Sequence, residues 1–452
     1  MIQDMTVGSP SRILLGFSAP MILSGMFQQL YNVVDSVVAG KFAGVDALAA
    51  VGASYPITML FIAVATGAGL GCSVVISQLF GAREYALMKT AISTSLLSML
   101  VLSLVCTGAG WVFCDPLMRL MNTPGNIFSD SALYLRIYVW GLVFLFLYNI
   151  ATAVFNGLGD SKTPLYFLVF SSLLNIALDL LFVAVFRMGV AGVAWATFIA
   201  QGISSLISVG VLLLRLKRTE AEGETRFFDG MLLLRMGRIA LPSILQQSIV
   251  SIGQLCVQAL INSFGSVVVA GYSSAIKVDS FFKMTLISMS NAVSSFTAQN
   301  IGARKYDRVN QGRRTGLVSM IIYGAVSFVL ILFTGKALIG LFVDSSAGGA
   351  DAAAVGAGYM MIVSAGYAVM AVLMIHNGIL RGAGYMVGFT SATLLDLVIR
   401  VAFSYLLAGW TGSYEAIWWA IPLGWAVAAV LSVCFYQFGS WRPAAKQPES
   451  RV

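Results

Sequence analysis

The chain has 452 residues, of which 58% are hydrophobic and only 10% are charged. Because a soluble globular chain carries about 25% charged residues, this composition excludes a soluble enzyme and indicates a protein that folds in lipid. The net charge of +8 alone is compatible with nucleic-acid binding, but the positions of the cations, given below, argue against it. The five scattered cysteines and the single histidine, His376, provide neither a metal-binding cluster nor a disulfide framework.

Apolar segments long enough to cross a bilayer, which takes about 20 residues, follow one another along the whole chain. Twelve such segments are predicted, at residues 14–38, 48–78, 90–113, 131–155, 164–186, 191–214, 239–262, 267–298, 315–334, 353–379, 388–408 and 416–438. The fold class that follows is an all-α integral membrane protein with 12 transmembrane helices.

The second half of the chain repeats the first at an offset of about 220 residues. The recurring features are Pro20 and Pro242, Gln-x-x-Gly-Ala-Arg at 78–83 and 299–304, Gly-x-Gly at 157–159 and 382–384, and Trp195 and Trp418. Six spans per copy is an even number, so both copies have the same orientation, and the repeat is parallel with its pseudo-twofold axis along the membrane normal. Duplicated helical halves are frequent in secondary transporters.

The repeat and the one long polar stretch together predict the domain organisation. We expect an N-terminal six-helix lobe at 1–214, a cytoplasmic linker at 215–238, a C-terminal six-helix lobe at 239–438 and a cytoplasmic tail at 439–452. The side of the membrane that holds both termini collects 19 of the lysines and arginines, whereas the other side holds 5. By the positive-inside rule both termini are cytoplasmic, and the excess of cations is a signal of orientation rather than of nucleic-acid binding.

Four aspartates lie inside predicted spans, where a carboxylate is costly and points to function. Two of them have a base four residues later on the same helix face: Asp279 precedes Lys283, and Asp396 precedes Arg400. These two pairs are interpreted as neutralised structural pairs. Asp35 and Asp179 have no cation nearby in the sequence.

The expected depths in the membrane place one of the unpaired acids, Asp179, near two side chains with neutral oxygen atoms, Asn175 and Thr197. At 1.5 Å per residue, Asp179 lies about 22 Å from the cytoplasmic face and Thr197, on the next antiparallel span, about 21 Å. Asn175 lies one turn before Asp179 on the same face. Asp35 falls at the outer edge of the core by the same reckoning, although Pro20 and helix tilt could bring it inward.

A cluster of Asp35, Asn175, Asp179 and Thr197 has two chemical interpretations. It could hold a proton, because burial and like charge favour the protonated carboxyl, or Na⁺, a hard cation that suits oxygen ligands. A purely structural role, in which these polar groups hydrogen-bond to one another and only support helix packing, is also an open alternative. The second copy has Asp396 and Arg400 in place of Asn175 and Asp179, so it does not repeat the cluster.

The recurring motifs, in register in both halves, resemble those of the MATE family, the multidrug and toxic compound extrusion transporters. The resemblance covers the whole chain, and the first Gly-x-Gly turn continues as Asp-Ser-Lys-Thr-Pro at 160–164, as the family's turn often does. It implies two six-helix lobes in a V with a central cavity, and alternating access driven by antiport of H⁺ or Na⁺.

Within the family, the sequence is similar to the prokaryotic DinF-like branch. That similarity implies a cation site in the N-terminal lobe, and the matching residues are Asp35, Asn175, Asp179 and Thr197. The NorM-like branch instead uses acids of the seventh and tenth spans. Here the seventh span offers only glutamines and the tenth-span acid would fall near Met370, so the chain departs from that pattern.

The function predicted from these features is a cation-coupled antiporter that exports amphipathic, mostly cationic drugs. We predict Tyr31, Tyr138 and Asn149 to line the substrate cavity. We expect no catalytic residue, no cofactor and no metal beyond the coupling ion, H⁺ or Na⁺. The expected partners are small-molecule organic cations and membrane lipid, not nucleic acid, and we expect a monomer in the bacterial inner membrane.

The alternative function is that of a flippase for a lipid-linked saccharide. An anionic lipid-linked substrate requires several arginines or lysines facing the cavity. Within the spans the chain offers only Lys277, Lys283 and Arg400, and two of these have an acid one turn away. This shortage of free cations favours the exporter.

Overall fold

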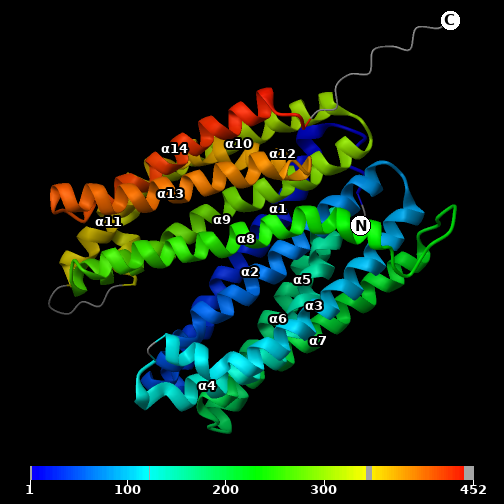
Figure 1. Cartoon of the computed structure of the whole chain (residues 1–452). Helices are drawn as coiled ribbons and strands as arrows, with labels where there is room; N and C mark the ends of the chain where they lie inside the picture. The colour runs from blue at the N-terminus through cyan, green and yellow to red at the C-terminus, as the bar shows by residue number, and fades with distance from the viewer. Residues whose placement is uncertain (1–2, 122, 343–348, 442–452) are drawn as a thin grey trace, which may run out of the picture. The chain divides into compact units, whose positions relative to one another are not determined.

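The computed structural model describes residues 3–121, 123–342 and 349–441, and over these residues it contains helices and no β-strand (Figure 1). The predicted all-α fold is confirmed. The predicted cytoplasmic tail lies outside the described residues from residue 442 onward. The elements are α1 (Pro10–Val38), the π-helical segment η1 (Ala39–Ala43), α2 (Val45–Gly81), α3 (Tyr85–Leu120), α4 (Gly125–Trp140), α5 (Leu142–Gly157), α6 (Lys162–Asp179), the π-helical segment η2 (Leu180–Val185), α7 (Gly189–Arg218), α8 (Gly230–Asn262), α9 (Ser266–Gly302), α10 (Tyr306–Gly340), α11 (Gly349–Ala365), α12 (Tyr367–Gly382), α13 (Met386–Thr411) and α14 (Glu415–Phe438).

Length and composition identify the membrane-crossing helices among the described residues. Nine of the described helices are each long and apolar enough to cross a membrane. Two bent pairs, α4 with α5 and α11 with α12, bring the number to eleven if each pair counts as one span. The remaining predicted span corresponds to α9, which has 37 residues and carries Lys277, Asp279 and Lys283. This helix is rich in serine as well, so it is the least apolar of the predicted spans.

Two of the predicted spans, 131–155 and 353–379, are not single helices. Each is broken into two helices, which meet at 50° at Gly141 and at 52° at Gly366. At both breaks the glycine amide donates to the carbonyl oxygen three residues earlier, which tightens the helix locally. A Cβ at Gly366 would approach Pro422 of α14 to 2.8 Å, so the glycine also lets the neighbouring helix come close.

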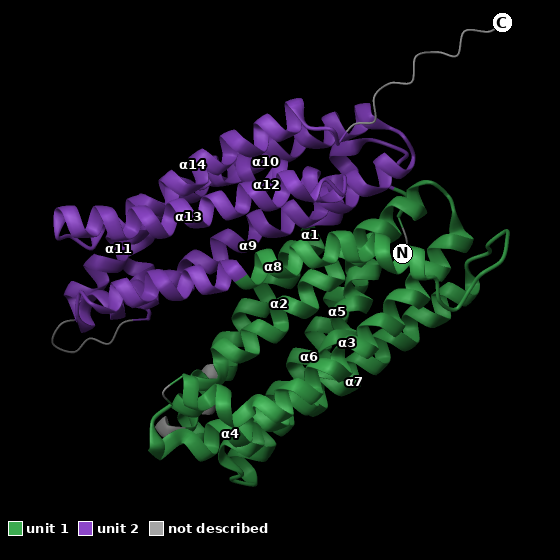
Figure 2. Ribbon diagram, viewed as in Figure 1, with its two compact units in different colours: residues 1–4, 19–248 green, residues 5–18, 249–452 purple. Residues whose placement is uncertain are grey.

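The described helices form two compact units (Figure 2). Unit 1 comprises residues 1–4 and 19–248, and unit 2 comprises residues 5–18 and 249–452. The start of α1 therefore belongs to unit 2, and the start of α8 belongs to unit 1. Because these units divide the chain elsewhere than the predicted lobes, the lobe boundaries at 214 and 239 stay predictions from the repeat.

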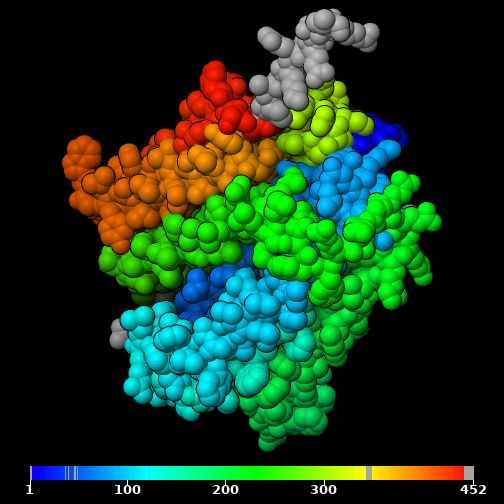
Figure 3. Space-filling model, turned by 45° about the vertical axis from the view of Figure 1, so that its right-hand side comes forward, coloured from blue at the N-terminus to red at the C-terminus, as the bar shows by residue number. Residues whose placement is uncertain are grey.

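Each unit packs its helices in the same pattern. In unit 1, α2 packs on α3, α4 and α5, and α7 packs on α5 and α6. In unit 2, the corresponding helix α9 packs on α10, α11 and α12, and α14 packs on α12 and α13. Figure 3 shows the surface that neighbouring helices of unit 1 form together, with α3 and α4 in light blue to cyan.

The recurring glycine motifs end helices with a left-handed residue in both copies. Arg83 and Arg304 follow α2 and α9 with φ of 62° and 58°, and Gly159 and Gly384 follow α5 and α12 with φ of 80° and 75°. In each case the next amide bonds back to a carbonyl five residues earlier, as in a Schellman motif. Both copies of the repeat therefore use the same tight turns at these motifs.

Residues 5–8, which precede α1, form hydrogen bonds with the end of α9, the turn that follows it and the start of α10 in unit 2. The Met5 amide donates to Gln299 Oε1 at 2.9 Å, and Lys305 Nζ donates to the Thr6 carbonyl oxygen at 2.8 Å. Arg308 donates to the carbonyl oxygens of Met5 at 3.0 Å and Gly8 at 2.8 Å. The start of α1 is thereby anchored to unit 2.

Candidate functional site

Three helices of unit 1 supply the residues that the sequence groups together. Asp35 lies near the end of α1, Asn175 and Asp179 lie one turn apart on α6, and Thr197 lies on α7. A π-helical segment follows each acid within about one turn: η1 starts four residues after Asp35, and η2 starts at the residue after Asp179. π-Helical turns inside α-helices are frequent at functional sites, because they shift the helix register locally.

The Asn175 amide connects three of the helices around the acids. With its nitrogen turned toward the carboxylate, it lies 2.9 Å from Asp179 Oδ2 and 2.9 Å from the Tyr31 hydroxyl, and its oxygen lies 3.2 Å from the Thr197 amide nitrogen. The Thr197 hydroxyl donates to the Val193 carbonyl oxygen at 3.0 Å. Asn175 and Asp179 are 2% and 1% exposed, so this connection is shielded from water.

The two carboxyl groups lie within hydrogen-bonding reach of each other. In the part of the chain that the structure describes, neither Asp35 nor Asp179 forms an ion pair, and the Oδ1 atom of each is buried without a hydrogen-bond partner. Two ionised carboxylates so close and so poorly hydrated repel each other strongly. The arrangement is therefore suited to a shared proton or to a bound cation.

The structure distributes the three residues predicted to line the cavity over three positions in unit 1. Tyr31 belongs to the cluster through Asn175. Tyr138, on α4, is half-buried and stacks on Tyr134 with ring centroids 6.2 Å apart. Asn149, on α5, donates to the Leu145 carbonyl oxygen at 2.8 Å and faces α2, so it lies apart from the acids. Their role at a cavity stays a prediction.

The oxygen-rich cluster offers little to a transition metal or to zinc. No group of three or more histidine, cysteine, aspartate or glutamate side chains converges among the described residues. The donors present are two carboxylates, an amide, a hydroxyl and a phenol, which suit a proton or a hard monovalent cation.

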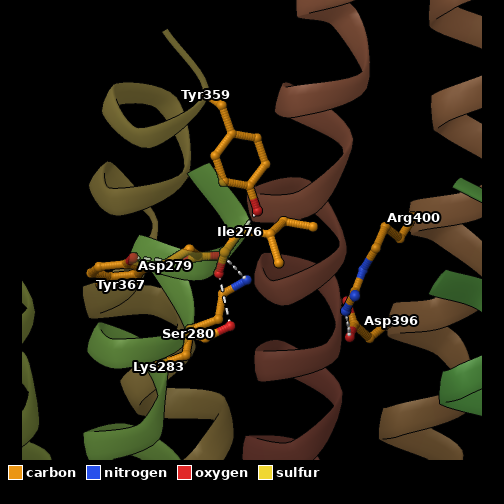
Figure 4. A network of polar contacts seen from close by, with 8 residues as sticks. All are labelled: Ile276, Asp279, Ser280, Lys283, Tyr359, Tyr367, Asp396 and Arg400. Atoms are coloured by element: carbon orange, nitrogen blue, oxygen red, sulfur yellow. Dashed lines mark hydrogen bonds and ion pairs between the residues drawn. The ribbon is translucent and has the colours of Figure 1, made fainter. Parts of the chain in front are cut away.

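Unit 2 contains a second buried network, around Asp279 and Asp396 (Figure 4). Both acid–base pairs predicted from the i, i+4 spacing are present: Lys283 Nζ lies 2.5 Å from Asp279 Oδ2, and Arg400 binds Asp396. Sequence reasoning missed the two tyrosines that complete the Asp279 site. Tyr359 donates to Oδ2 at 2.9 Å and Tyr367 to Oδ1 at 2.6 Å, from helices whose spacing gives no hint of this contact.

A clasp, formed by Asp160, Thr163 and Arg215, closes the turn between α5 and α6 of unit 1. Asp160 is 1% exposed and is held by Arg215, by the Thr163 amide at 3.1 Å and by the Thr163 hydroxyl at 2.7 Å. Burial of Asp160 opposes its ionisation, but the hydrogen bonds from Arg215 and Thr163 outweigh it and lower the pKa of Asp160 to about 2. The clasp ties this turn to the end of α7.

Comparison with known proteins decides the family. The MatE family model matches residues 20–181 and 242–406, which are the two copies of the repeat and most of the chain. The chain belongs to the MatE family. The resemblance read from the recurring motifs is thereby confirmed at the level of the family, whereas the DinF-like branch stays a prediction.

Several relatives of this MATE protein carry names that refer to multidrug resistance or multidrug export. The probable multidrug resistance protein YpnP of Bacillus subtilis is 31% identical over 441 residues, which cover 97% of each chain. The multidrug export protein MepA of Staphylococcus saprophyticus is 20% identical and covers 90% of this chain and 89% of its own. The crystal structure of MATE in complex with MaL6 superposes with a TM-score of 0.90 at 24% identity, over 96% of this chain and 97% of the other.

These likenesses establish a multi-pass membrane transporter with the two-lobe, twelve-helix fold of MATE proteins. MATE is a family of transporters, and its multidrug members act on small molecules. The chain is thus a transport protein rather than a member of an enzyme family.

Proposed function

We propose that this chain is a cation-coupled antiporter that exports amphipathic organic cations, with Asp35 and Asp179 as the coupling groups. The observation that supports the proposal is a pair of neighbouring carboxyls, each with a buried oxygen that has no hydrogen-bond partner, and neither with an ion-pairing base among the described residues. A pair of this kind takes up one positive charge readily and resists holding none. We further propose that the chain acts as a monomer in the bacterial plasma membrane, with both termini in the cytoplasm.

In this proposal the coupling ion and the drug use the same negative charge in turn. A proton or Na⁺ that enters from outside lowers the negative charge of the pair by one, weakens the attraction for a cationic drug and favours its release. Loss of the ion to the cytoplasm restores the charge for the next drug molecule. Asn175 positions Asp179 through its amide, and Tyr31 and Thr197 hold Asn175 in turn.

The test is efflux of a fluorescent cationic dye from proteoliposomes that contain the purified protein. An imposed pH gradient and an imposed Na⁺ gradient are compared for wild type, Asp179→Asn and Asp115→Asn. Asp115 is a half-exposed acid of unit 1 that pairs with Arg136 at 2.8 Å, so its replacement controls for loss of a carboxylate as such.

We expect one gradient to drive transport in wild type and in Asp115→Asn, and no transport in Asp179→Asn. Full efflux by folded Asp35→Asn and Asp179→Asn variants would exclude these residues as coupling groups. No dye transport by folded wild type under either gradient would instead favour the lipid-linked saccharide flippase.

A further inference from the structure

The Asp279 carboxylate in unit 2 is built into a site that binds an ammonium group. It is 2% exposed, and two phenols from α11 and α12 hold its two oxygens, at 2.9 Å for Tyr359 and 2.6 Å for Tyr367. The phenols fix the carboxylate in one orientation and leave Oδ2 to accept one more donor. That donor is Lys283 Nζ, at 2.5 Å (Figure 4).

Aromatic rings supply the rest of the site. Lys283 Nζ lies 5.2 Å from the ring centroid of Trp425, within the range of a cation–π interaction. Tyr359 also packs edge-on against Trp418, with ring centroids 5.1 Å apart, so the phenol that orients Asp279 is itself held in place. A fixed carboxylate combined with an aromatic face is the chemistry by which proteins recognise organic ammonium ions.

The Asp279 side chain is more tightly constrained by its neighbours than the Lys283 side chain. The Asp279 side chain is 3% exposed, whereas the Lys283 side chain is 24% exposed and has four rotatable carbons. Among the described residues Lys283 has one ion-pair partner, Asp279, and its other contact, with the face of Trp425, is a less directional cation–π interaction. The carboxylate and the two tyrosines are thus held in fixed positions, whereas the lysine side chain can leave the carboxylate and return to it.

We propose that Asp279, Tyr359, Tyr367 and Trp425 form a binding site for the protonated amine of a transported compound, and that Lys283 occupies this site when the compound is absent. The inference rests on the proposed export of organic cations. The amine of the substrate replaces Lys283 on Oδ2 and on the face of Trp425, and the lysine side chain swings toward its exposed side.

The short contact to Oδ2 sets the selectivity of the site. Lys283 Nζ forms an ion pair with Oδ2 at 2.5 Å, and a primary ammonium ion carries three N–H bonds that it can direct at a carboxylate. A quaternary ammonium has none, so it can use the aromatic face but not the carboxylate. The site therefore prefers primary amines over quaternary ions of similar size.

Chemical rescue tests the site without any transport measurement. In purified Lys283→Ala, methylammonium is expected to restore the melting temperature toward that of wild type, whereas tetramethylammonium at equal ionic strength is not. Lys283→Ala with Asp279→Asn should not respond to either ion. Lys277→Ala serves as the matched control, because Lys277 lies on the same helix, is exposed and pairs with no acid among the described residues.

Equal effects of methylammonium and tetramethylammonium on folded Lys283→Ala would overturn the proposal and leave Asp279–Lys283 as a structural pair. If Lys283→Ala does not fold, the proposal is tested instead by binding of an organic amine to the wild-type protein. Hexylammonium is titrated against tryptophan fluorescence, and we expect saturable quenching with an affinity about tenfold weaker in Asp279→Asn, equivalent to about 1.4 kcal/mol. Absence of saturable quenching in wild type would overturn the proposal, while dye efflux tests the exporter separately.

Discussion

Unit 1 and unit 2 each carry two aspartates within predicted membrane spans, but the charges of the two pairs of aspartates are balanced differently. In unit 2, Asp279 and Asp396 each have a base one helical turn later, and both ion pairs form. In unit 1, Asp35 and Asp179 approach each other, and over the described residues neither has a base. The two acids of unit 2 are neutralised by bases of the same helix, whereas the two acids of unit 1 have no ion-pairing base among the described residues.

The difference arises from few residues at corresponding positions of the repeat. Asp396 and Arg400 of α13 stand where Asn175 and Asp179 stand on α6. An acid followed by a base neutralises itself, whereas an amide followed by an acid leaves a net negative charge. The comparison teaches that both copies share one helical arrangement, and that a change of charge at one helix face separates the unit proposed to couple transport to an ion from the charge-neutral one.

Removing an acid from unit 1 is expected to have the largest effect, on transport and not on folding. Asp179→Asn or Asp35→Asn should reduce driven dye efflux to the level of empty liposomes. The melting temperature in detergent should stay the same or rise, because the repulsion between two close carboxylates is relieved. A variant that keeps wild-type efflux would show that unit 1 does not carry the coupling charge.

Removing an acid from unit 2 is expected to affect folding first. Asp396→Asn leaves the Arg400 guanidinium, whose side chain is 17% exposed, without its ion-pair partner, and should cost about 3–5 kcal/mol of unfolding free energy. Chemical unfolding in detergent measures this loss. The double variant Asp396→Asn with Arg400→Gln should be milder than the single one, and an equal or larger loss would contradict the neutralised-pair interpretation.

The Asp160 clasp gives a pH-dependent difference, because unit 2 has Tyr385 at the corresponding position. Asp160→Asn should cost about 2 kcal/mol through weakened charged hydrogen bonds. The folded pKa of about 2 lies below the usual value of about 3.9, so the stabilisation is complete above pH 5 and is lost as the pH falls through 4 toward 2. The gap between the unfolding free energies of wild type and variant should shrink as the pH falls from about 5 to about 2, and a constant gap across this range would refute the assignment.

Close helix packing gives the smallest expected effect and is also unequal between the copies. Gly71 of α2 meets the start of α8 so closely that a Cβ would lie 2.5 Å from the Ala240 nitrogen, whereas Ala292 stands at the corresponding place in unit 2. Gly71→Ala should cost about 1 kcal/mol, because overpacking exceeds the gain in helix propensity. Gly108→Ala, with nothing within 4 Å, is the control and should stabilise slightly. Equal shifts of the melting temperature in the two variants would mean that α8 moves away from the added methyl group without loss of stability.

The sequence by itself determined the all-α membrane fold, the repeat, the glycine turns and the two ion pairs of unit 2. These features depend on composition and on neighbours within one helix, where 3.6 residues per turn place positions i and i+4 on one face. The same geometry set Asn175 and Asp179 one turn apart.

The tertiary structure alone decided which helices meet around the acids. The approach of α1 to α6, which joins Asp35 to Asp179, and the two tyrosines on Asp279 join residues far apart in the chain, and no local spacing encodes them. The breaks at Gly141 and Gly366 and the exchange of helix starts between the units likewise depend on packing against neighbours. Burial of one helix against another selects these contacts, and that selection is absent from the pattern of any single segment.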